Sequence, residues 1–273
     1  MPIWHATKTG GMMDDSTDNN DSGEFVRALA RGLAVLKAFD QNTPAMTLSD
    51  VARRTGLSRA SAGRFLKTLV ALEYASFDGR DYRLRPRVLE LGMAYFSSHS
   101  FIDIANPILK ATADRAQEPC SMAVLDGSDI VYVVRHTADR MMSINITIGK
   151  RYPAHYTSLG WVLLGGLEDD EVRRIVAKAE LRQVTAHTIT DRAHLHRLIM
   201  QGRRDGFCEA ESQLETGILS IAVPVRDRTG TIIAAINMGV PASRHDRESL
   251  KRDLLPVLYE AAAEIEFALS KRL

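Results

Sequence analysis

Residues 47–85 read TLSDVARRTGLSRASAGRFLKTLVALEYASFDGRDYRLR, and their pattern decides the fold of the first part of the chain. Thr47 is a suitable N-cap for a first helix over residues 48–54, where apolar side chains recur at helical spacing. Ser58 caps a second helix over about residues 59–72, which carries one apolar stripe. The stretch therefore predicts two short helices in close succession.

A hairpin signal follows the second helix. Residues 74–77 and 81–84 resemble short strands, and the Asp78-Gly79 pair between them is a common hairpin turn. Gly56 supplies a tight turn between the two helices. Two helices, a glycine turn and a hairpin in this order predict a winged helix-turn-helix, in which the hairpin is the wing.

The polar face of the second helix has the chemistry of a DNA-binding surface. Such a helix fits the major groove, and its first turns bring short polar and Arg side chains to base edges. Arg pairs with guanine or phosphate, and hydroxyl groups donate to either. The predicted DNA-binding residues are Thr47, Ser58, Arg59, Ala60, Ser61, Arg64, Lys67, Arg80 and Arg83.

The charge distribution supports this interpretation. Residues 25–87 contain twelve Lys and Arg against five Asp and Glu, whereas the rest of the chain is net acidic, so the overall charge of +1 conceals a basic domain. A helical hairpin with a solvated basic face is the alternative. Gly63 is unusual inside a recognition helix and costs about 1 kcal/mol relative to Ala. Close approach to DNA would explain it, as would simple tolerance.

Length and composition indicate an ordinary globular protein. The chain has 273 residues, 45% hydrophobic and 25% charged, which suits about two domains. It shows no run of about 20 apolar residues and no signal-peptide pattern, so we expect a cytoplasmic protein with no membrane partner. Cys120 and Cys208 are expected to be buried small hydrophobes rather than a disulfide.

Changes in composition divide the chain. Residues 1–24 are polar and acidic and predict a disordered tail. Residues 25–85 form the predicted DNA-binding domain, beginning with a helix over residues 25–39 that packs across its core. An amphipathic linker helix is expected within residues 86–100, and residues 101–273 form a second domain.

The second domain is predicted to be α+β, with an antiparallel sheet flanked by helices. Its first helix, over about residues 102–116, is expected to be interrupted or restarted at Pro107. Further helices are expected over residues 157–167, 169–179, 191–204 (capped by Thr190) and 246–273 (broken only by Pro256). Alternating patterns predict strands over residues 120–126, 130–136, 141–148, 207–213, 219–225 and 232–238.

Several segments resemble a known family. LARGLAVL at 29–36, SRAS at 58–61, RYPAHYTSLG at 151–160 and SIAVPV at 220–225 resemble the IclR family of bacterial transcriptional regulators, and the resemblance covers nearly the whole chain from Phe25. Within that family, the chain most resembles regulators of the protocatechuate and β-ketoadipate pathway, including the 4-hydroxybenzoate regulators. This narrower resemblance rests on residues 32–39, the hairpin at 124–135 and TITD at 188–191.

The resemblance implies a winged helix-turn-helix, a linker helix and a GAF-like effector domain. It also implies homodimers or homotetramers that bind palindromic double-stranded DNA, respond to a small aromatic or dicarboxylic acid, and need no cofactor. A carboxylate leaving water needs a cation or several donors. Arg135, His155 and the amides at the start of the helix near Thr157 could supply them. By position, the implied effector residues are Arg135, Met142, His155, Tyr156, Thr157, Ser158, Cys208, Ser220 and Asn237.

Two residues depart from the family pattern. Trp161 stands where this motif usually has Lys or Arg, and Tyr152 replaces an aliphatic residue. The pocket or the adjoining surface is therefore expected to differ from that of the relatives.

Other patterns allow alternative interpretations. His187, His194 and His196 lack metal-ligand spacing and are expected to be surface histidines, with no metal bound. Cys208 could be a nucleophile, but no orienting group or oxyanion hole stands at a recognisable spacing, so it is expected to pack or to line the pocket. We therefore expect no catalytic residues and no enzyme. A small-molecule enzyme with an accessory nucleic-acid-binding domain is the alternative hypothesis.

Some charged residues remain open. Arg135 could form a structural ion pair instead of binding the effector. Three acidic residues could be solvated strand-edge charges or could face a partner subunit's Arg, and they stay unassigned: Glu209, Glu211 and Glu215.

Overall fold

The computed structural model describes residues 25–137 and 146–271. The chain forms two compact units with the boundary between Ser97 and Ser98. The DNA-binding pattern and the effector pattern of the sequence fall in different units.

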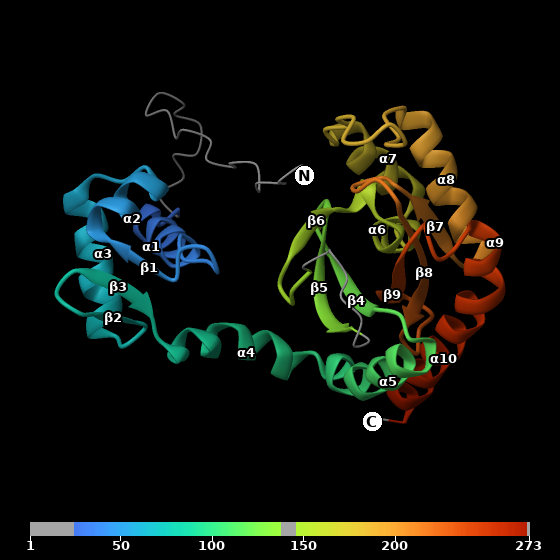
Figure 1. Cartoon of the computed structure of the whole chain (residues 1–273), viewed down its shortest axis with the longest axis horizontal. Coiled ribbons are helices and arrows are strands. Elements are labelled where there is room, and N and C mark those ends of the chain that lie inside the picture. The colour runs from blue at the N-terminus through green and yellow to red at the C-terminus, as the bar shows by residue number, and fades with distance from the viewer. Residues whose placement is uncertain (1–24, 138–145, 272–273) are drawn as a thin grey trace. The chain divides into compact units, whose positions relative to one another are not determined.

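The first unit is a winged helix-turn-helix. Its three-stranded antiparallel sheet has the order β1-β3-β2, and the β2–β3 hairpin is the wing (Figure 1). The elements follow the chain as α1 (Arg27–Lys37), β1 (Ala45–Thr47), α2 (Leu48–Thr55), α3 (Arg59–Ala71), β2 (Ala75–Phe77), β3 (Asp81–Leu84), η1 (Pro86–Val88) and α4 (Leu89–Ser98).

The predicted caps of this unit are confirmed. Thr47 and Asp50 form a capping box at the start of α2, and the Ser58 hydroxyl accepts from the backbone N–H of Ser61 at the start of α3. Gly56 ends α2 in the left-handed conformation, with a φ of 70°. These local signals place α3 against a core that includes Val35 and other buried apolar residues of α1, α2 and β3.

Strand β1 was not predicted. The sequence pattern showed no strand before Thr47, yet Ala45–Thr47 pairs with β3 in antiparallel register. Three residues are too few to display an alternating pattern, so only the partner strand reveals this one. Strand β2 is one residue shorter than the strand predicted over residues 74–77, because Tyr74 lies outside it.

The second unit is α+β, as predicted, and its sheet is antiparallel throughout. The six strands lie in the order β6-β5-β4-β9-β8-β7. The elements are α5 (Ser100–Ala116), β4 (Cys120–Asp126), β5 (Asp129–His136), β6 (Arg151–Pro153), η2 (Ala154–Tyr156), α6 (Ser158–Gly165), α7 (Asp169–Lys178), α8 (Arg192–Asp205), β7 (Cys208–Glu211), β8 (Ile218–Arg226), β9 (Ile232–Pro241), α9 (Arg247–Ser249), the π-helix η3 (Leu250–Leu254) and α10 (Leu255–Ser270).

Helices cover both faces of this sheet (Figure 1). On one face, α6 packs against β4, β5, β7, β8 and β9, and α8 packs on α6. On the other face, α5 packs against β4 and β5, and α10 packs against β8 and β9. Successive side chains of a strand point to opposite faces, so the residues facing α6 can be assigned from the register.

Three predictions in the second unit are wrong in detail, and a fourth lies mostly outside the described residues. Helix α5 continues through Pro107 without interruption, because a proline removes only one backbone donor and the flanking residues are held by packing. The predicted strand over 141–148 lies partly outside the described residues, and residues 146–148 are irregular. Asp191, not Thr190, caps α8. The final helix is divided at the π-helix that precedes Pro256.

Candidate nucleic-acid interface and effector site

Helix α3 presents unpaired cations to solvent. The side chains of Arg59, Arg64 and Lys67 are exposed, and none of them lies within ion-pair distance of a carboxylate in the described part of the chain. By contrast, Arg53 and Arg54 of α2 pair with Asp50 and Asp40. A cation without an internal partner is free to bind an external anion, and phosphate or guanine suits this geometry.

The remaining predicted residues of the helix region serve partly as caps. The Thr47 hydroxyl donates to Asp50 Oδ2 at 2.7 Å, and the Ser58 hydroxyl accepts from Ser61 N–H at 3.2 Å. Ala60 is exposed in the first turn of α3, and Ser61 is half-buried. Ser58, Ala60 and Ser61 therefore lie at the N-terminal end of α3, whereas Thr47 lies at the start of α2.

The wing is held by one carboxylate. Asp78 accepts backbone hydrogen bonds from Asp81 at 2.8 Å and from Arg80 at 3.0 Å, and these bonds lower the pKa of its carboxyl. Arg80 is exposed and makes no ion pair among the described residues, whereas the guanidinium of Arg83 lies 3.9 Å from Asp78. Arg80 is thus the freer of the two predicted wing contacts.

Gly63 does not face the exposed surface of α3. A Cβ atom at Gly63 would lie 3.6 Å from a methyl group of Leu48, so the position points at α2. This is an ordinary van der Waals distance. Of the two explanations drawn from the sequence, tolerance fits this geometry and close approach to DNA does not.

On the α6 side of the second unit, the strand register places one row of side chains across five strands. Arg135 pairs with Ser121, Ser121 with Asn237, Asn237 with Ala222, and Ala222 with Cys208. Directly paired residues point to the same face, so the row mixes polar and small side chains beneath α6. Ser220, two residues before Ala222 on β8, faces the same way.

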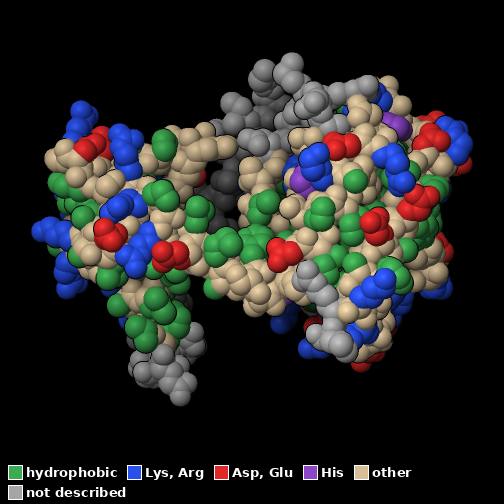
Figure 2. All heavy atoms as spheres, turned by 90° about the horizontal axis from the view of Figure 1, so that it is seen from below, with side chains coloured by type: hydrophobic (Ala, Val, Ile, Leu, Met, Phe, Trp, Pro, Cys, Tyr) green, Lys and Arg blue, Asp and Glu red, His purple; other side chains and the backbone are tan. Residues whose placement is uncertain are grey.

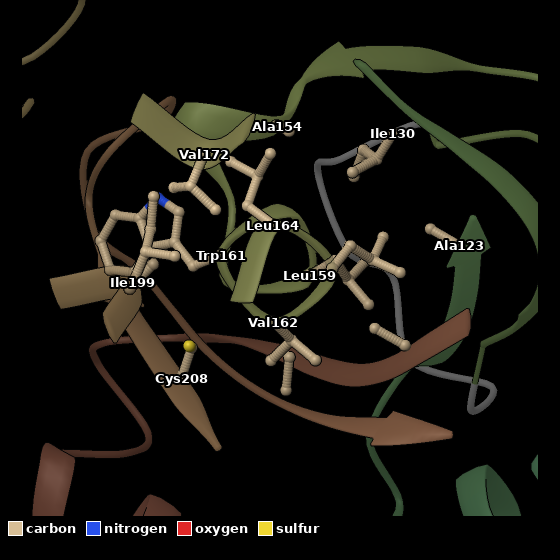
Figure 3. Close-up of a cluster of buried hydrophobic side chains, with 14 of the residues drawn as sticks. Ala123, Ile130, Ala154, Leu159, Trp161, Val162, Leu164, Val172, Ile199 and Cys208 are labelled. Atoms are coloured by element: carbon tan, nitrogen blue, oxygen red, sulfur yellow. The ribbon is translucent and has the colours of Figure 1, made fainter. Parts of the chain in front are cut away.

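Alanines lie beside this row. Ala123 and Ala235 are paired on β4 and β9, two residues along from Ser121 and Asn237, and both are buried. Figure 3 shows Leu159 and Val162 of α6 directed toward the strands of this face. Both alanines belong to the buried cluster that α6 forms with the sheet.

Arg135 is half-buried without a carboxylate partner. Its Nη1 donates to Ser121 Oγ at 2.9 Å, and among the described residues no Asp or Glu lies within ion-pair distance of it. Burial lowers the pKa of the guanidinium, and the neighbours that oppose this effect are Tyr132, Tyr152 and Cys120. The alternative role of Arg135 in a structural ion pair is therefore not seen in the described chain.

A second polar group lies at the start of α6. His155 Nε2 and Ser158 Oγ are buried and have no hydrogen-bond partner among the described residues. Burial lowers the pKa of His155, which favours its neutral form. Thr157 caps α6 by accepting from the backbone N–H of Gly160 at 2.9 Å. Two of the four predicted residues here thus have unused hydrogen-bonding capacity.

Tyr156 ties down a neighbouring loop. Its hydroxyl accepts from the backbone N–H of Arg182 at 2.9 Å and lies 3.0 Å from the carbonyl oxygens of Glu180 and Arg182. Its ring contacts that of His155, with centroids 4.0 Å apart. The side chain links the start of α6 to the segment after α7, and its hydroxyl is already used.

The amino-acid sequence matches two regulator domains over most of its length. Residues 28–79 match the IclR helix-turn-helix domain, and residues 93–267 match the bacterial transcriptional regulator IclR C-terminal domain. The chain belongs to the IclR family. Both matched segments are regulator domains, which favours a transcriptional regulator over an enzyme with an accessory DNA-binding domain.

Relatives support the narrower resemblance as well. The Pca regulon regulatory protein of Pseudomonas putida is 39% identical over 243 residues, covering 89% of this chain and 84% of that protein. The p-hydroxybenzoate hydroxylase transcriptional activator of Acinetobacter baylyi is 32% identical over 255 residues, covering 92% and 94%. A solved IclR homologue from Microbacterium hydrocarbonoxydans, complexed with 4-hydroxybenzoate, is 28% identical with a TM-score of 0.79, covering 90% and 100%.

The two departures from the IclR pattern lie near the start of α6. Trp161 is buried, and its Nε1 donates to the carbonyl oxygen of His155 at 2.8 Å. Figure 3 shows its ring beside Val172 and Ile199, on the side of α6 away from Ala123. Tyr152 is half-buried and contacts Tyr132 edge to face at 6.1 Å. Trp161 therefore fixes the backbone that carries His155.

One residue of the effector site was not predicted from the sequence, and one predicted residue lies outside the described part of the chain. Met142 lies outside the described residues. Ser121 was not predicted, although it binds Arg135, because only the strand register brings the two together. Cys208 is buried, and burial raises the pKa of its thiol to about 12, which suppresses the thiolate. It packs in the cluster of α6, as the sequence predicted.

Two of the acidic residues left open and one of the three histidines find partners within the described chain. Arg247 bonds to Glu211 at 3.0 Å and lies 3.5 Å from Glu209. His196 binds Asp169 at 2.7 Å, while two other histidines are exposed, His187 and His194. Over residues 25–137 and 146–271, no group of three or more metal-ligand side chains comes together, and no helix is long and apolar enough to cross a membrane.

Proposed function

We propose that this IclR-family regulator binds a palindromic operator as a homodimer or homotetramer and is controlled by a small aromatic or dicarboxylic acid. Residues 25–85 bind the operator, residues 86–100 link the units, and residues 101–273 bind the effector and support oligomers. It acts in the cytoplasm, where bacterial DNA lies. The observation that carries the proposal is the half-buried guanidinium of Arg135, which has no described carboxylate partner and lies in a polar row beside an alanine floor.

The site suits a flat anion. A carboxylate at Arg135 and Ser121 would receive charge-assisted hydrogen bonds that offset its loss of water. A ring attached to that carboxylate would lie along the sheet over Ala123 and Ala235, where larger side chains would leave no depth. Asn237, next in the row, can donate or accept toward a ring substituent.

The start of α6 offers the second recognition point. His155 Nε2 and Ser158 Oγ are buried and unpaired in the described chain, and leaving such groups unsatisfied costs about 1–3 kcal/mol each. A hydroxyl group of the effector would satisfy one or both. The relative solved with 4-hydroxybenzoate and the activator of p-hydroxybenzoate hydroxylase support an acid of this kind.

The first unit has an apolar surface that suits a second copy of the chain. Four large apolar side chains are exposed here, Leu29 to 64%. Two precede α1, Phe25 and Val26, and two lie on it, Leu29 and Leu33. Figure 2 shows hydrophobic side chains gathered on the surface of this unit. A two-fold pair of helix-turn-helix units matches the two half-sites of a palindrome, which lie about 34–36 Å apart or a multiple of this.

Calorimetry on the full chain tests the effector. We expect 4-hydroxybenzoate, protocatechuate or β-ketoadipate to bind, and 4-hydroxybenzamide, which lacks the charge, to bind at least tenfold more weakly. If none of the three acids binds, the proposed effector class is wrong, and the DNA-binding part of the proposal is unaffected. Equal binding of acid and amide would instead exclude Arg135 as the carboxylate anchor.

Selection of duplexes from a random pool tests the DNA-binding part. The enriched sequences should contain an inverted repeat with half-site centres about 10 base pairs, or a multiple of this, apart. Sedimentation of the protein with and without such a duplex should show a dimer or tetramer. Enrichment of a single, unrepeated half-site by a monomeric protein would contradict the proposal.

A further inference from the structure

The end of β5 carries two neighbouring side chains that point to opposite faces of the sheet. Arg135 faces α6 and binds Ser121, its partner on β4. The next residue, His136, faces α5, and its Nε2 lies 2.9 Å from Asn106 Oδ1 on that helix. Because consecutive residues share a peptide unit, a shift of the backbone at Arg135 also moves His136.

Asn106 lies beside the proline of α5, where one backbone hydrogen bond of the helix is missing. Pro107 follows it directly and cannot donate the hydrogen bond that would close the turn onto the carbonyl of Asp103. The helix is continuous through Pro107, so only this one backbone hydrogen bond is missing. A side-chain bond at Asn106 can therefore displace α5 locally at lower cost than at a fully bonded turn.

The far end of α5 is followed by a buried carboxylate with two side-chain partners. Glu118, two residues after the helix ends, is buried and accepts from Arg244 at 2.9 Å, with His245 Nε2 at 3.3 Å. The near end continues the chain from α4, with His99 alone between the two helices. A displacement of α5 at Asn106 can therefore reach α4 through the continuous chain.

We propose that the His136–Asn106 hydrogen bond carries the effector signal from Arg135 to α5 and, through the chain, to the linker helix α4. The inference rests on the proposed function, because it takes Arg135 as the effector anchor. His136 and Asn106 are positioning residues, since neither faces the effector site. Coupling residues of this kind typically change the response by about 2- to 30-fold.

The test measures operator affinity with and without saturating 4-hydroxybenzoate, using a duplex selected by the unaltered chain. The ratio of the two dissociation constants should move toward one by about 2- to 30-fold in His136→Phe and in Asn106→Leu. Affinity of the DNA-free protein for 4-hydroxybenzoate should change less than twofold. The double variant should be no worse than either single variant, because both remove the same bond.

His196→Phe is the matched control, since it removes a histidine bond between α7 and α8 on the other side of the sheet. It should leave the ratio unchanged. Additive effects in the double variant, or an equal loss in His196→Phe, would overturn the proposal and indicate general destabilisation.

A second experiment needs no effector and tests the coupling even if none of the acids binds. Arg135→Ala should change the hydrogen exchange of the α5 amides at residues 108–111, and the same substitution in a His136→Phe background should not. An equal response of α5 in both backgrounds would overturn the proposal. Failure of the acids to bind, with this difference in exchange retained, would refute the proposed effector and leave the coupling intact.

Discussion

Helices α3 and α6 begin with the same kind of cap but differ in how much of their surface is buried. Each starts behind a hydroxyl side chain, Ser58 or Thr157, that accepts from a backbone N–H of the first turn. Helix α3 then buries only Ala62, Leu66 and Leu69, whereas α6 buries every residue along its length. A helix with an open face can meet a macromolecule, but an enclosed helix can meet only a molecule small enough to lie between it and its sheet.

The same difference governs how much space each helix leaves. In α6, a Cβ atom at Gly160 would lie 2.0 Å from the carbonyl oxygen of Ala154, a distance that real atoms do not reach. In α3, the corresponding atom at Gly63 would make an ordinary contact. Helix α6 therefore requires a glycine at position 160 for its close packing, whereas α3 has room for a larger side chain at position 63.

The largest effect is expected from Gly160→Ala. The added methyl group must push α6 away from η2, which should lower the free energy of unfolding of the second unit by about 3 kcal/mol. Denaturant unfolding followed by Trp161 fluorescence, in a Trp4→Phe background, measures it. Gly165→Ala is the matched control in the same helix, because its Cβ would make contacts of 3.6 Å or longer. Equal stability of both variants would contradict the enclosed packing of α6.

Arg135→Ala is expected to weaken effector binding by about 1.5–3 kcal/mol, the usual range for a hydrogen bond to a charged group. Operator affinity without effector should change far less, and the transcriptional response should shift to higher effector concentration. Calorimetry and gel-shift titration on the same variant separate the two. Arg115→Ala, which removes a surface partner of Glu260, is the control. Unchanged effector affinity would exclude Arg135 as the anchor.

Arg64→Ala tests the open face of α3. If Arg64 reads a base, operator affinity should fall by about 1–3 kcal/mol and specificity should relax at one position. The fold should be retained, because the side chain is exposed and has no internal ion pair in the described chain. Arg53→Ala is the control on α2, where the guanidinium pairs with Asp50. A gel-shift titration in which both variants bind like the parent chain would remove Arg64 from the interface.

The helix-turn-helix could be predicted closely because its signals are local. A cap at Thr47, a turn at Gly56 and a cap at Ser58 act within a few residues, and each is found in the structure. Strand β1 could not be predicted, because its three residues gain their conformation from pairing with β3. Local chemistry thus specifies the helices of the first unit, and tertiary pairing completes its sheet.

The effector site was harder to predict, because its contacts depend on the pairing of strands that are distant in the sequence. Ser121 and Arg135 are fourteen residues apart, and their contact depends on the register of β4 and β5, which shifts at a bulge between Met122 and Ala123. Helix α6 shows no polar face, since all its sides are buried, and its sequence alone does not indicate which side meets the sheet. The family resemblance brought His155 and Ser158 into the candidate set, and the structure adds that their polar atoms are buried and unpaired.

Gly63→Ala should have the smallest effect and the opposite sign to Gly160→Ala. Alanine is favoured over glycine in a helix by about 1 kcal/mol, and the new methyl group would meet Leu48 at 3.6 Å without a clash, so the first unit should gain up to that amount. Because the position faces α2, operator affinity should stay within twofold of the parent chain. Thermal unfolding and a gel-shift titration measure the two quantities. A stable variant that binds the operator tenfold more weakly would show that the backbone at Gly63 does approach DNA, and the contrast between the two glycines would then reflect two binding surfaces instead of one open and one enclosed helix.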